Sequence, residues 1–361
     1  MTAPQPLAVG APRPPSQVYD VALLDLDGVV YVGPEAVPGV PDALAAARGA
    51  GMRLGFVTNN AARTPEDVAE HLTALGVPAR AEDVITSSQA AAAVVAELLS
   101  PGARVLPVGG AGVAAALTAV GLEVVDRAED DPVAVVQGYG RDVGWVQLAE
   151  AVVAVRNGAR HVATNVDATL PSPRGALPGN GALVGVVSAI TGQEPLVTGK
   201  PDPAMHAECV RRTGARRPLV VGDRLDTDIE GAQRAGAASL LVLTGVTDPG
   251  TLLAARPDHR PDLLAPDAGG LLAAHPRVVA QGPSYRCGSW RVGRAEGDDV
   301  LVLEPVADGN EGDGLDGLRA LCVAHWNRHP DAGAPARIIP SGERAAVALD
   351  RWGLASHHAA G

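Results

Sequence analysis

The sequence is poor in aromatic residues: its 361 residues include one Phe, four Tyr and four Trp. A core with so few rings must be built from aliphatic side chains. No apolar run approaches the roughly 20 residues that span a membrane. The first seventeen residues have neither the basic start nor the apolar centre of a signal peptide. We therefore expect a globular cytoplasmic protein that does not contact membranes.

Cysteine is also scarce. Cys209, Cys287 and Cys322 lie far apart, match no zinc spacing and are odd in number, which argues against a disulfide framework. The net charge of −12 makes nucleic acid and anionic membranes poor partners for the surface as a whole. A small anionic substrate is still compatible with it, because a bound divalent ion and a few fixed cations reverse the local potential.

Lysine is almost absent. Of 29 basic residues, only Lys200 is a lysine, and every other one is arginine. A single retained lysine indicates a position that needs a compact point charge, which a planar guanidinium does not supply. The alternative is that the residue is there by chance.

Apolar runs that read as buried strands alternate with helical patterns from residue 20 onward, which predicts a parallel sheet with right-handed connections. The alternation restarts after Ser100-Pro101-Gly102 and returns to its first pattern at Gly199. We expect an α/β fold: a Rossmann-like parallel-sheet core, a smaller inserted α/β cap and a small α+β C-terminal module. The expected ranges are 1–17 for a disordered N-terminal tail, 18–100 and 197–275 for the core, 101–196 for the cap, and 277–361 for the module.

Several individual elements are predicted from these patterns. A helix is expected over 113–120, another over 229–236, a long loop over 168–181, and a hairpin in the module around Gly297-Asp298-Asp299. Predicted strands of the core cover 21–26, 53–57, 83–86, 218–221 and 239–243.

Polar residues gather where predicted strands of the core end. Because the carboxyl ends of parallel strands open onto one crevice, residues about 200 positions apart can form one site. Carboxylate oxygens suit a hard cation such as Mg²⁺, whereas hydroxyl, amide and ammonium donors suit an anion. The set therefore predicts a phosphate ester held against Mg²⁺. Its members are Asp25 and Asp27, then Thr58, Asn59 and Asn60, then Lys200, and finally Asp223 and Asp228.

Asp25 has no helper base nearby in sequence, but an ionised carboxylate attacks phosphorus directly and forms an aspartyl-phosphate. Asp27, two positions further on, is placed to protonate the leaving oxygen and later to take a proton from water. The predicted reaction is hydrolysis of a phosphomonoester.

Four strings occur in a fixed order: Asp-Leu-Asp-Gly-Val-Val-Tyr from Asp25, Val-Thr-Asn-Asn from Val57, Gly-Lys-Pro-Asp-Pro from Gly199, and Gly-Asp-Arg-Leu-Asp-Thr-Asp-Ile from Gly222. Over residues 20–250 this order resembles the haloacid-dehalogenase (HAD) superfamily. Within it, the chain resembles the subclass IIA phosphatases with an inserted α/β cap, which act on phosphoglycolate, p-nitrophenyl phosphate, pyridoxal phosphate and glycerol 3-phosphate.

The resemblance implies a role for each site residue. Asp25 would be the nucleophile and Asp27 the acid and base; dehalogenase relatives lack the second Asp, which favours a phosphatase. Mg²⁺ would be held by Asp25, the Asp27 carbonyl and Asp223, with Asp228 behind them. The transferred phosphate would be bound by Thr58, Asn59, Asn60 and Lys200.

The cap loop would choose the substrate, with Asn165 and Asp167 bonding hydroxyls and Arg174 a second anion. Relatives with a tail similar to part of an acetyltransferase include glycerol 3-phosphate phosphatases, which favours that substrate. The alternative substrates are phosphoglycolate, a sugar phosphate, pyridoxal phosphate and a nucleoside monophosphate. The tail lacks an Arg/Gln-x-x-Gly-x-Gly/Ala turn for acetyl-CoA, so we expect no transferase activity. Caps of this type pair in relatives, which makes a homodimer the option that the resemblance implies.

Three other readings compete with the phosphatase. Gly110-Ala111-Gly112 begins a Gly-x-Gly-x-x-Ala string between a predicted strand and helix, which is typical of a dinucleotide-binding oxidoreductase. The same small residues would also let a cap helix pack closely. A non-enzymatic binding protein would tolerate loss of Asp25, and a phosphomutase would release no inorganic phosphate.

Overall fold

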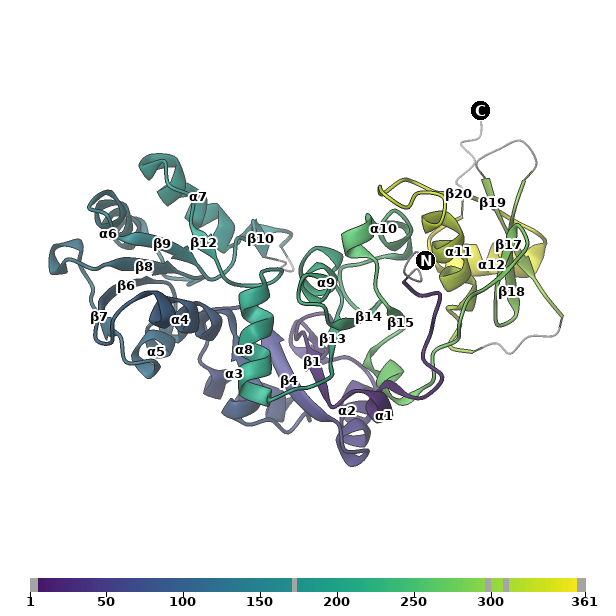
Figure 1. Ribbon diagram of the computed structural model, residues 1–361, viewed down its shortest axis with the longest axis horizontal. Helices are drawn as coiled ribbons and strands as arrows, with labels where there is room; N and C mark the ends of the chain where they lie inside the picture. Colours follow the sequence, from purple (N-terminus) through teal and green to yellow (C-terminus); the bar gives the residue numbers. More distant parts are fainter. Residues whose placement is uncertain (1–5, 171–173, 296–299, 308–311, 356–361) are drawn as a thin grey trace. The chain divides into compact units, whose positions relative to one another are not determined.

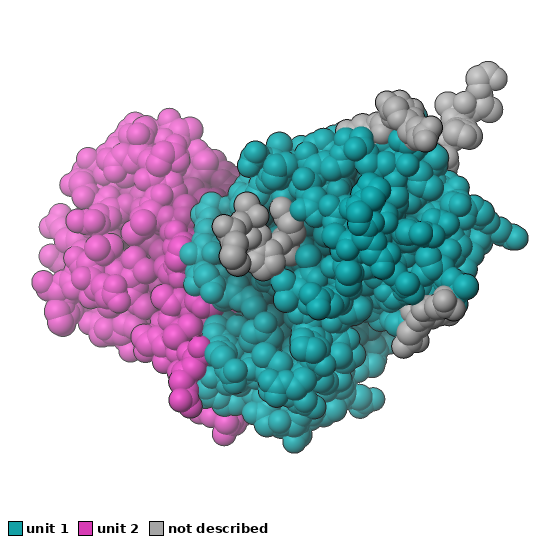
Figure 2. Space-filling model, turned by 45° about the vertical axis from the view of Figure 1, so that its right-hand side comes forward, with its two compact units in different colours: residues 1–54, 217–361 teal, residues 55–216 magenta. Residues whose placement is uncertain are grey.

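The computed structural model of the protein describes residues 6–170, 174–295, 300–307 and 312–355. It divides the chain into two compact units (Figure 2). Unit 1 comprises residues 1–54 and 217–361, and unit 2 comprises residues 55–216. Among the residues that the structure describes, no helix is long and apolar enough to cross a membrane.

Unit 1 contains a parallel sheet with the strand order β15-β14-β13-β1. All four residues of β1 are buried, as expected for a continuous apolar run with both faces covered. Leu24 at the end of β1 pairs with Val221 near the end of β13, so Asp25 and Asp223 follow at the same edge. The strands are β1 Val21–Leu24, β13 Pro218–Gly222, β14 Ala238–Val242 and β15 Leu263–Ala265, beside the two-stranded β2 Tyr31–Val32 and β3 Glu35–Ala36.

Helices and short helical turns connect these strands. Asp248 caps α10 by accepting from the Thr251 amide, and Asp267 caps η5 by accepting from the Gly269 amide. The helical elements of this part of unit 1 are α1 Pro15–Val18, α2 Val40–Gly49, η3 Leu225–Ile229, α9 Glu230–Arg234, α10 Pro249–Leu253, η4 Pro257–His259 and η5 Ala268–Leu272.

The N-terminal segment differs from the disordered tail expected over residues 1–17, of which residues 1–5 lie outside the described ranges. Leu7 is buried in the main apolar cluster of unit 1. Ala11 forms an antiparallel bridge with His275, with both backbone hydrogen bonds in place, and the Val278 amide donates to Ala8. The sequence gives no periodicity for this segment because its order comes from pairing with residues more than 260 positions away.

The C-terminal module consists of a five-stranded sheet, in the order β16-β17-β18-β19-β20, and two helices. Helix α11 lies between α10 and strands β17 and β18 (Figure 1), and all its residues are buried. Trp326 on α11 donates from Nε1 to the Leu253 carbonyl at 3.0 Å, and both residues belong to one apolar cluster. The module therefore shares its core with the parallel sheet. Its elements are β16 Val279–Gln281, β17 Ser284–Cys287, β18 Trp290–Arg294, β19 Val300–Pro305, α11 Asp316–Trp326, β20 Arg337–Pro340 and α12 Glu343–Arg351.

The predicted hairpin in the module is present as the antiparallel pair β18 and β19. Its expected turn, Gly297-Asp298-Asp299, lies outside the described residues. Strands β19 and β20 run parallel, because α11 connects them.

Unit 2 contains the parallel pair β4 and β5 and a five-stranded parallel sheet, in the order β12-β9-β8-β6-β7. Helices α4 and α5 cover one face of the five-stranded sheet, and α6 and α7 cover the other (Figure 1). The strands are β4 Arg53–Thr58, which begins in unit 1, β5 Val84–Thr86, β6 Arg104–Val108, β7 Glu123–Val124, β8 Ala134–Gln137, β9 Arg160–Ala163, β10 Thr169–Leu170, β11 Leu177–Pro178 and β12 Leu196–Val197. The helical elements are α3 Pro65–Ala74, η1 Ala81–Asp83, α4 Ser87–Leu98, α5 Ala111–Ala119, η2 Ala128–Asp130, α6 Trp145–Arg156, α7 Asn180–Thr191 and α8 Pro203–Thr213.

Local capping explains where helices of unit 2 begin. Thr64 and Asp67 form a capping box at α3, with a proline at the first helical position. Asp202 caps α8 by accepting from the Ala204 amide, so this helix starts at Pro203, three residues after Lys200. The single phenylalanine, Phe56, is fully buried in β4. The predicted α/β class with parallel sheets and a C-terminal sheet module is confirmed.

Candidate active site

Three carboxylates gather at the carboxyl edge of the sheet in unit 1. Asp25 follows β1, Asp223 follows β13, and Asp228 lies in the helical turn behind it. One oxygen of each lies within 4.8 Å of those of the other two, and Asp223 and Asp228 are each only 1% exposed. Three acids this close repel one another unless a cation lies among them. Oxygen-only donors of this kind fit a hard divalent ion such as Mg²⁺.

Backbone geometry fixes the positions of these acids. The Val246 amide donates to Asp223 Oδ2 at 2.7 Å, and the Arg224 amide donates to Asp228 Oδ2 at 3.1 Å. A Cβ at position 222 would lie 2.2 Å from the Asp228 Cβ, so only glycine fits between β13 and that acid. A single wide π-helical turn, Leu225–Ile229, brings Asp228 back toward the strand end.

Gly28 lets the chain turn sharply after Asp27. Its φ is +88°, and a Cβ there would lie 2.5 Å from Asp223 Oδ2. Its amide donates to the Tyr31 carbonyl at 2.8 Å, which closes a tight turn. This turn leaves the Asp27 side chain exposed, two residues after Asp25. Desolvation by neighbouring atoms raises the pKa of Asp27, against a hydrogen bond from the Gly33 backbone, which favours the protonated form that a general acid needs.

The loop that follows β14 also contributes to the site, and it was not predicted from the sequence. Thr244 donates from its hydroxyl to the Gly28 carbonyl at 2.5 Å, and two residues later the Val246 amide reaches Asp223. The loop therefore ties the turn after β1 to the acid after β13. The only sequence feature that points to it is a Thr-Gly pair directly after an apolar strand.

Donors of the predicted phosphate site lie in unit 2, at the end of β4. Thr58 is largely buried, and its hydroxyl oxygen accepts from the Asn60 amide at 3.1 Å. Because that oxygen is already an acceptor, the hydroxyl proton is left to donate to a bound anion. The exposed Asn60 side chain instead accepts from the Ala62 amide at 2.9 Å, which shapes the loop.

Asn59 connects the β4 loop to Lys200 and to the cap. Its Oδ1 accepts from the Lys200 amide at 2.8 Å, while Nδ2 donates to the Lys200 carbonyl at 3.1 Å and to Asp167 Oδ2 at 3.3 Å. Both Nδ2 hydrogens are therefore used within the protein, so its side chain positions Lys200. The Lys200 ammonium lies 3.5 Å from the Val57 carbonyl, at the strand end where Thr58 follows.

The three cap residues predicted from the sequence differ in their burial and in their hydrogen-bond partners. Asn165 is buried, and its Nδ2 donates to the Asn59 carbonyl at 2.7 Å, so it joins the cap loop to the β4 loop. Asp167 is half-buried and accepts from Asn59. Arg174 is exposed. The loop that follows Asp167 carries the short antiparallel pair β10 and β11, and Arg174 lies between these two strands in sequence.

In the Gly110-Ala111-Gly112 string, the backbone amides of both glycines are hydrogen-bonded within the protein. The Gly110 amide donates to Tyr139, and the Gly112 amide donates to the Ala62 carbonyl at 3.2 Å. A Cβ on Gly112 would lie 2.4 Å from the Arg63 carbonyl oxygen. The amides that would bind a pyrophosphate are thus taken up by a packed loop, and the structure favours the close-packing interpretation.

A second acidic group in unit 1 does not suit a metal ion. Glu230, Asp258 and His259 bring their ligand atoms within 4.8 Å of one another. However, Glu230 also forms ion pairs with Arg234 and Arg256, and Arg256 pairs with Asp258 at 2.7 Å. The charge that a cation would balance is already balanced by arginine.

Known families match three parts of the chain. Residues 22–123 match the haloacid dehalogenase-like hydrolases, and residues 197–271 match a second HAD-hydrolase-like family. Residues 287–354 match the GCN5-related N-acetyltransferase like domain. The predicted superfamily and the acetyltransferase-like tail are thereby confirmed.

Curated proteins and solved structures extend the match to almost the whole chain. The D-glycerol 3-phosphate phosphatase of Mycobacterium tuberculosis is 45% identical over 343 residues, 94% of this chain and 95% of that protein. The acid sugar phosphatase of Staphylococcus saprophyticus is 40% identical over 231 residues, 63% of this chain and 88% of that protein.

Among solved structures, the glycerol phosphate phosphatase of M. tuberculosis in complex with magnesium superposes with a TM-score of 0.83 at 44% identity, covering 95% of this chain and 99% of that one. The 4-nitrophenylphosphatase of Thermotoga maritima superposes with a TM-score of 0.66 at 30% identity, covering 72% and 98%. With this identity over nearly its full length and the motif acids in place, the chain belongs to the haloacid dehalogenase-like hydrolase family.

Proposed function

We propose that this protein is a Mg²⁺-dependent phosphatase that hydrolyses glycerol 3-phosphate to glycerol and phosphate. The observation that carries the proposal is the oxygen cluster of Asp25, Asp223 and Asp228 in a chain 45% identical to a D-glycerol 3-phosphate phosphatase. Asp25, the Asp27 carbonyl and Asp223 would hold the ion, with Asp228 supporting them. Bound there, Mg²⁺ neutralises charge on the phosphoryl oxygens, which otherwise repel a nucleophile.

The first chemical step would be carried out by two aspartates. An oxygen of the Asp25 carboxylate attacks phosphorus and forms an aspartyl-phosphate, while the bond from phosphorus to the glycerol oxygen breaks. Asp27 gives its proton to that leaving oxygen. In the second step Asp27 takes a proton from water, the water oxygen attacks phosphorus, and the bond to Asp25 breaks. Free phosphate and the starting enzyme result.

Three groups of unit 2 would bind the phosphoryl oxygens: the Thr58 hydroxyl, the Lys200 ammonium and the backbone amide of Asn59. The Asn59 side chain is excluded from this role because its donors serve Lys200 and Asp167. Asn60 would shape the loop, since its amide and its side-chain oxygen are both used locally. A compact ammonium suits a phosphate that must also be released after each turnover.

Substrate choice would depend on the cap loop. Asp167 and Arg174 are the side chains we propose to contact the alcohol part of the substrate, and Asn165 would hold the loop in place through Asn59. Pocket contacts tune such preferences by about 1–3 kcal/mol per group. A panel of phosphoglycolate, a sugar phosphate, pyridoxal phosphate and a nucleoside monophosphate therefore has to be compared with glycerol 3-phosphate.

The decisive experiment measures release of inorganic phosphate from this panel by the full chain, with Mg²⁺ and with excess chelator. We expect glycerol 3-phosphate to be the best substrate and chelation to abolish turnover. Asp25→Asn should lower kcat at least about a thousandfold with the fold intact by circular dichroism, whereas the exposed Asp142→Asn should not change it. Binding without phosphate release would indicate a binding protein or a phosphomutase instead.

We further propose that the protein is cytoplasmic and forms a homodimer through unit 2. Trp145 and Val146 on α6 are 82% and 67% exposed, and Ile190 on the neighbouring α7 is 50% exposed. An apolar surface of this kind is typical of an interface. Light scattering should give twice the chain mass for the native protein and the single chain mass for Val146→Asp; a native monomer would contradict the proposal.

A further inference from the structure

Unit 1 holds a cavity of about 610 Å³ whose lining residues include none of the three active-site acids. We call it the module pocket. Its walls come from four parts of the chain: Ala11 in the N-terminal segment, the stretch from Pro266 to Pro276 that joins the parallel sheet to the module, Gly288 in the turn between β17 and β18, and the start of α11 with Asp313 and Asp316. All of these parts lie in one compact unit.

His275 presents an unused acceptor to this pocket. The residue is 6% exposed, and its backbone is fixed on both sides by Ala11. Ring nitrogen Nε2 lies 2.9 Å from the Gly270 carbonyl, which can only accept, so Nε2 carries the proton. Nδ1 of the neutral ring is then a lone-pair acceptor. It is buried and has no hydrogen-bond partner among the described residues.

The protonation state of the ring supports this assignment. Desolvation by burial lowers the pKa of His275 and outweighs the hydrogen bonding to the Gly270 and Leu264 carbonyls and the charge of Asp313, which raise it, so the neutral ring dominates near pH 7. A buried acceptor without a partner loses the hydrogen bond that water would give it, which destabilises the empty site. A donor placed in the pocket would restore that bond.

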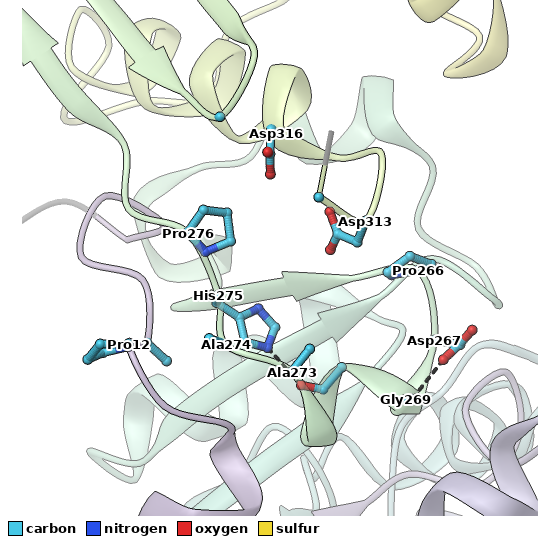
Figure 3. Close-up of a pocket in the computed structure, with 14 residues that line it drawn as sticks. Pro12, Pro266, Asp267, Gly269, Ala273, Ala274, His275, Pro276, Asp313 and Asp316 are labelled. Carbon is cyan, nitrogen blue, oxygen red and sulfur yellow. Dashed lines mark hydrogen bonds between the residues drawn. The ribbon is translucent and has the colours of Figure 1, made fainter. Parts of the chain in front are cut away.

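Two carboxylates face the same space. Figure 3 shows Asp316 and Asp313 around the opening opposite the ring edge of His275 that carries Nδ1. Arg319 bonds both acids, at 2.9 Å to Asp316 Oδ1 and at 2.7 Å to Asp313 Oδ1. The single positive charge of Arg319 balances only one of the two negative charges of Asp313 and Asp316. Burial raises the pKa of Asp316, and a bound cation would reverse part of that rise.

Most of the rest of the wall is apolar and small, with Pro12, Pro266, Ala273 and Pro276 around the polar groups, and Asp267 is a third acid in the lining (Figure 3). A bare metal ion does not fit. Among the described residues, the groups of three or more metal-ligating atoms within 4.8 Å of one another are the active-site acids and the Glu230 group, and neither includes His275 or Asp316. The pocket therefore offers separated acceptors, an excess of negative charge, since three lining acids face the single guanidinium of Arg319, and a short hydrocarbon wall.

We propose that the module pocket binds a small aliphatic amine, whose ammonium group donates to His275 Nδ1 and to the Asp316 carboxylate. An ammonium has only donors to offer. Asp316 already accepts from Arg319 and from the Cys287 thiol, and a carboxylate has lone pairs left for one further donor. The alkyl chain lies against the proline and alanine wall. This site is separate from the phosphatase reaction and includes no catalytic residue.

The test is calorimetric titration of the full-length, Mg²⁺-saturated protein with n-butylamine, and with n-butanol as the matched neutral compound. We expect saturable binding of one butylamine per chain with a Kd of about 1 mM, and at least about tenfold weaker binding of butanol. Absence of saturable butylamine binding up to about 10 mM would overturn the proposal, and so would equal binding of the two compounds.

Two isosteric variants locate the site. Asp316→Asn keeps an acceptor for Arg319 but removes the charge, and His275→Gln keeps a donor toward Gly270 but removes Nδ1. Each should weaken butylamine binding at least about tenfold. Asp350→Asn, on the exposed face of α12, should leave it unchanged. If Asp316→Asn fails to fold by circular dichroism, His275→Gln decides alone, and unchanged affinity in a folded His275→Gln rejects the site.

Discussion

Asn59 holds the main chain of Lys200 from two sides, accepting from its amide at 2.8 Å and donating to its carbonyl at 3.1 Å. This pairing joins two loops that are 141 residues apart in sequence. It positions the backbone of the chain's single lysine with two directional bonds. The ammonium of Lys200 thereby extends from a backbone with little freedom to move.

Replacing Asn59 with alanine should therefore impair catalysis without abolishing it. Both bonds to Lys200 and the bond to Asp167 are lost, so we expect kcat/KM for glycerol 3-phosphate to fall about tenfold to a hundredfold. Steady-state phosphate release measures the effect. Asn157→Ala at the exposed end of α6 is the control. A change of less than twofold in Asn59→Ala would show that Lys200 needs no such support.

The role of Asp27 predicts a dependence on the leaving group. Asp27→Asn cannot protonate the departing oxygen, which matters greatly for an alkoxide and little for p-nitrophenolate, a stable anion. We expect kcat for glycerol 3-phosphate to fall at least about a hundredfold more than kcat for p-nitrophenyl phosphate. Parallel assays of the two substrates with the same enzyme preparation measure the ratio. Equal losses on both would assign Asp27 a purely structural role.

Gly112 is expected to be intolerant of a side chain. Its Cβ would lie 2.4 Å from a backbone oxygen of Arg63, so Gly112→Ala should lower the free energy of unfolding by about 1–3 kcal/mol. Gly185 on α7 is the matched control, because nothing lies within 4 Å of its Cβ. Gly185→Ala should be neutral or stabilising by up to about 1 kcal/mol. Urea unfolding measures both, and titration with NAD⁺ should show no saturable binding.

Acid should destabilise unit 2 through His161. This residue is 5% exposed, and burial lowers its pKa from 6.5 to about 4. Between these two pH values the unfolded chain binds a proton at His161 that the folded chain does not bind. The contribution of neutral His161 to the free energy of unfolding is therefore complete above pH 6.5 and is lost as the pH falls toward 4. By about pH 4.5 the loss amounts to about 2–3 kcal/mol.

His161→Gln removes this titration while keeping a donor toward Gln137, which lies 3.0 Å from the ring. Urea midpoints of the native protein and the variant should therefore converge as the pH falls from about 7 to about 4.5. A constant difference between the two proteins across that range would contradict the assignment.

Strand positions were predicted well because long apolar runs have few alternatives in a parallel sheet. The strand expected over 218–221 is observed as Pro218–Gly222. Helix starts were less accurate where glycine stands inside a helix. Helix α5 begins at Ala111 and not at 113, because Gly112 packs against the loop before α3, a contact that no local pattern reveals.

Other elements depended on contacts between distant residues. The helix expected over 229–236 is preceded by a π-helical turn that Asp228 closes by accepting from the Arg224 amide. The loop expected over 168–181 contains a hairpin whose two-residue strands are too short to show a period of two.

The identities of the candidate site residues could be proposed from the sequence, because strand-end carboxylates and donors suggest their own chemistry. The role of each side chain could not be predicted from the sequence. Asn59 and Asn165 look alike as polar donors after a strand, yet the first positions Lys200 and the second bonds the Asn59 carbonyl. An amide donates and accepts equally well, so its partner is decided by tertiary structure alone.

The pairing of Ala11 with His275 has a consequence for how the protein is made. Unit 1 is discontinuous, with an N-terminal edge that pairs with residues synthesised much later and a core completed by Trp326. Unit 2 is one continuous stretch. On the ribosome, all residues of unit 2 are therefore synthesised before those of unit 1 are complete. The N-terminal residues around Asp25 can make their native contacts only after almost the entire chain has been synthesised.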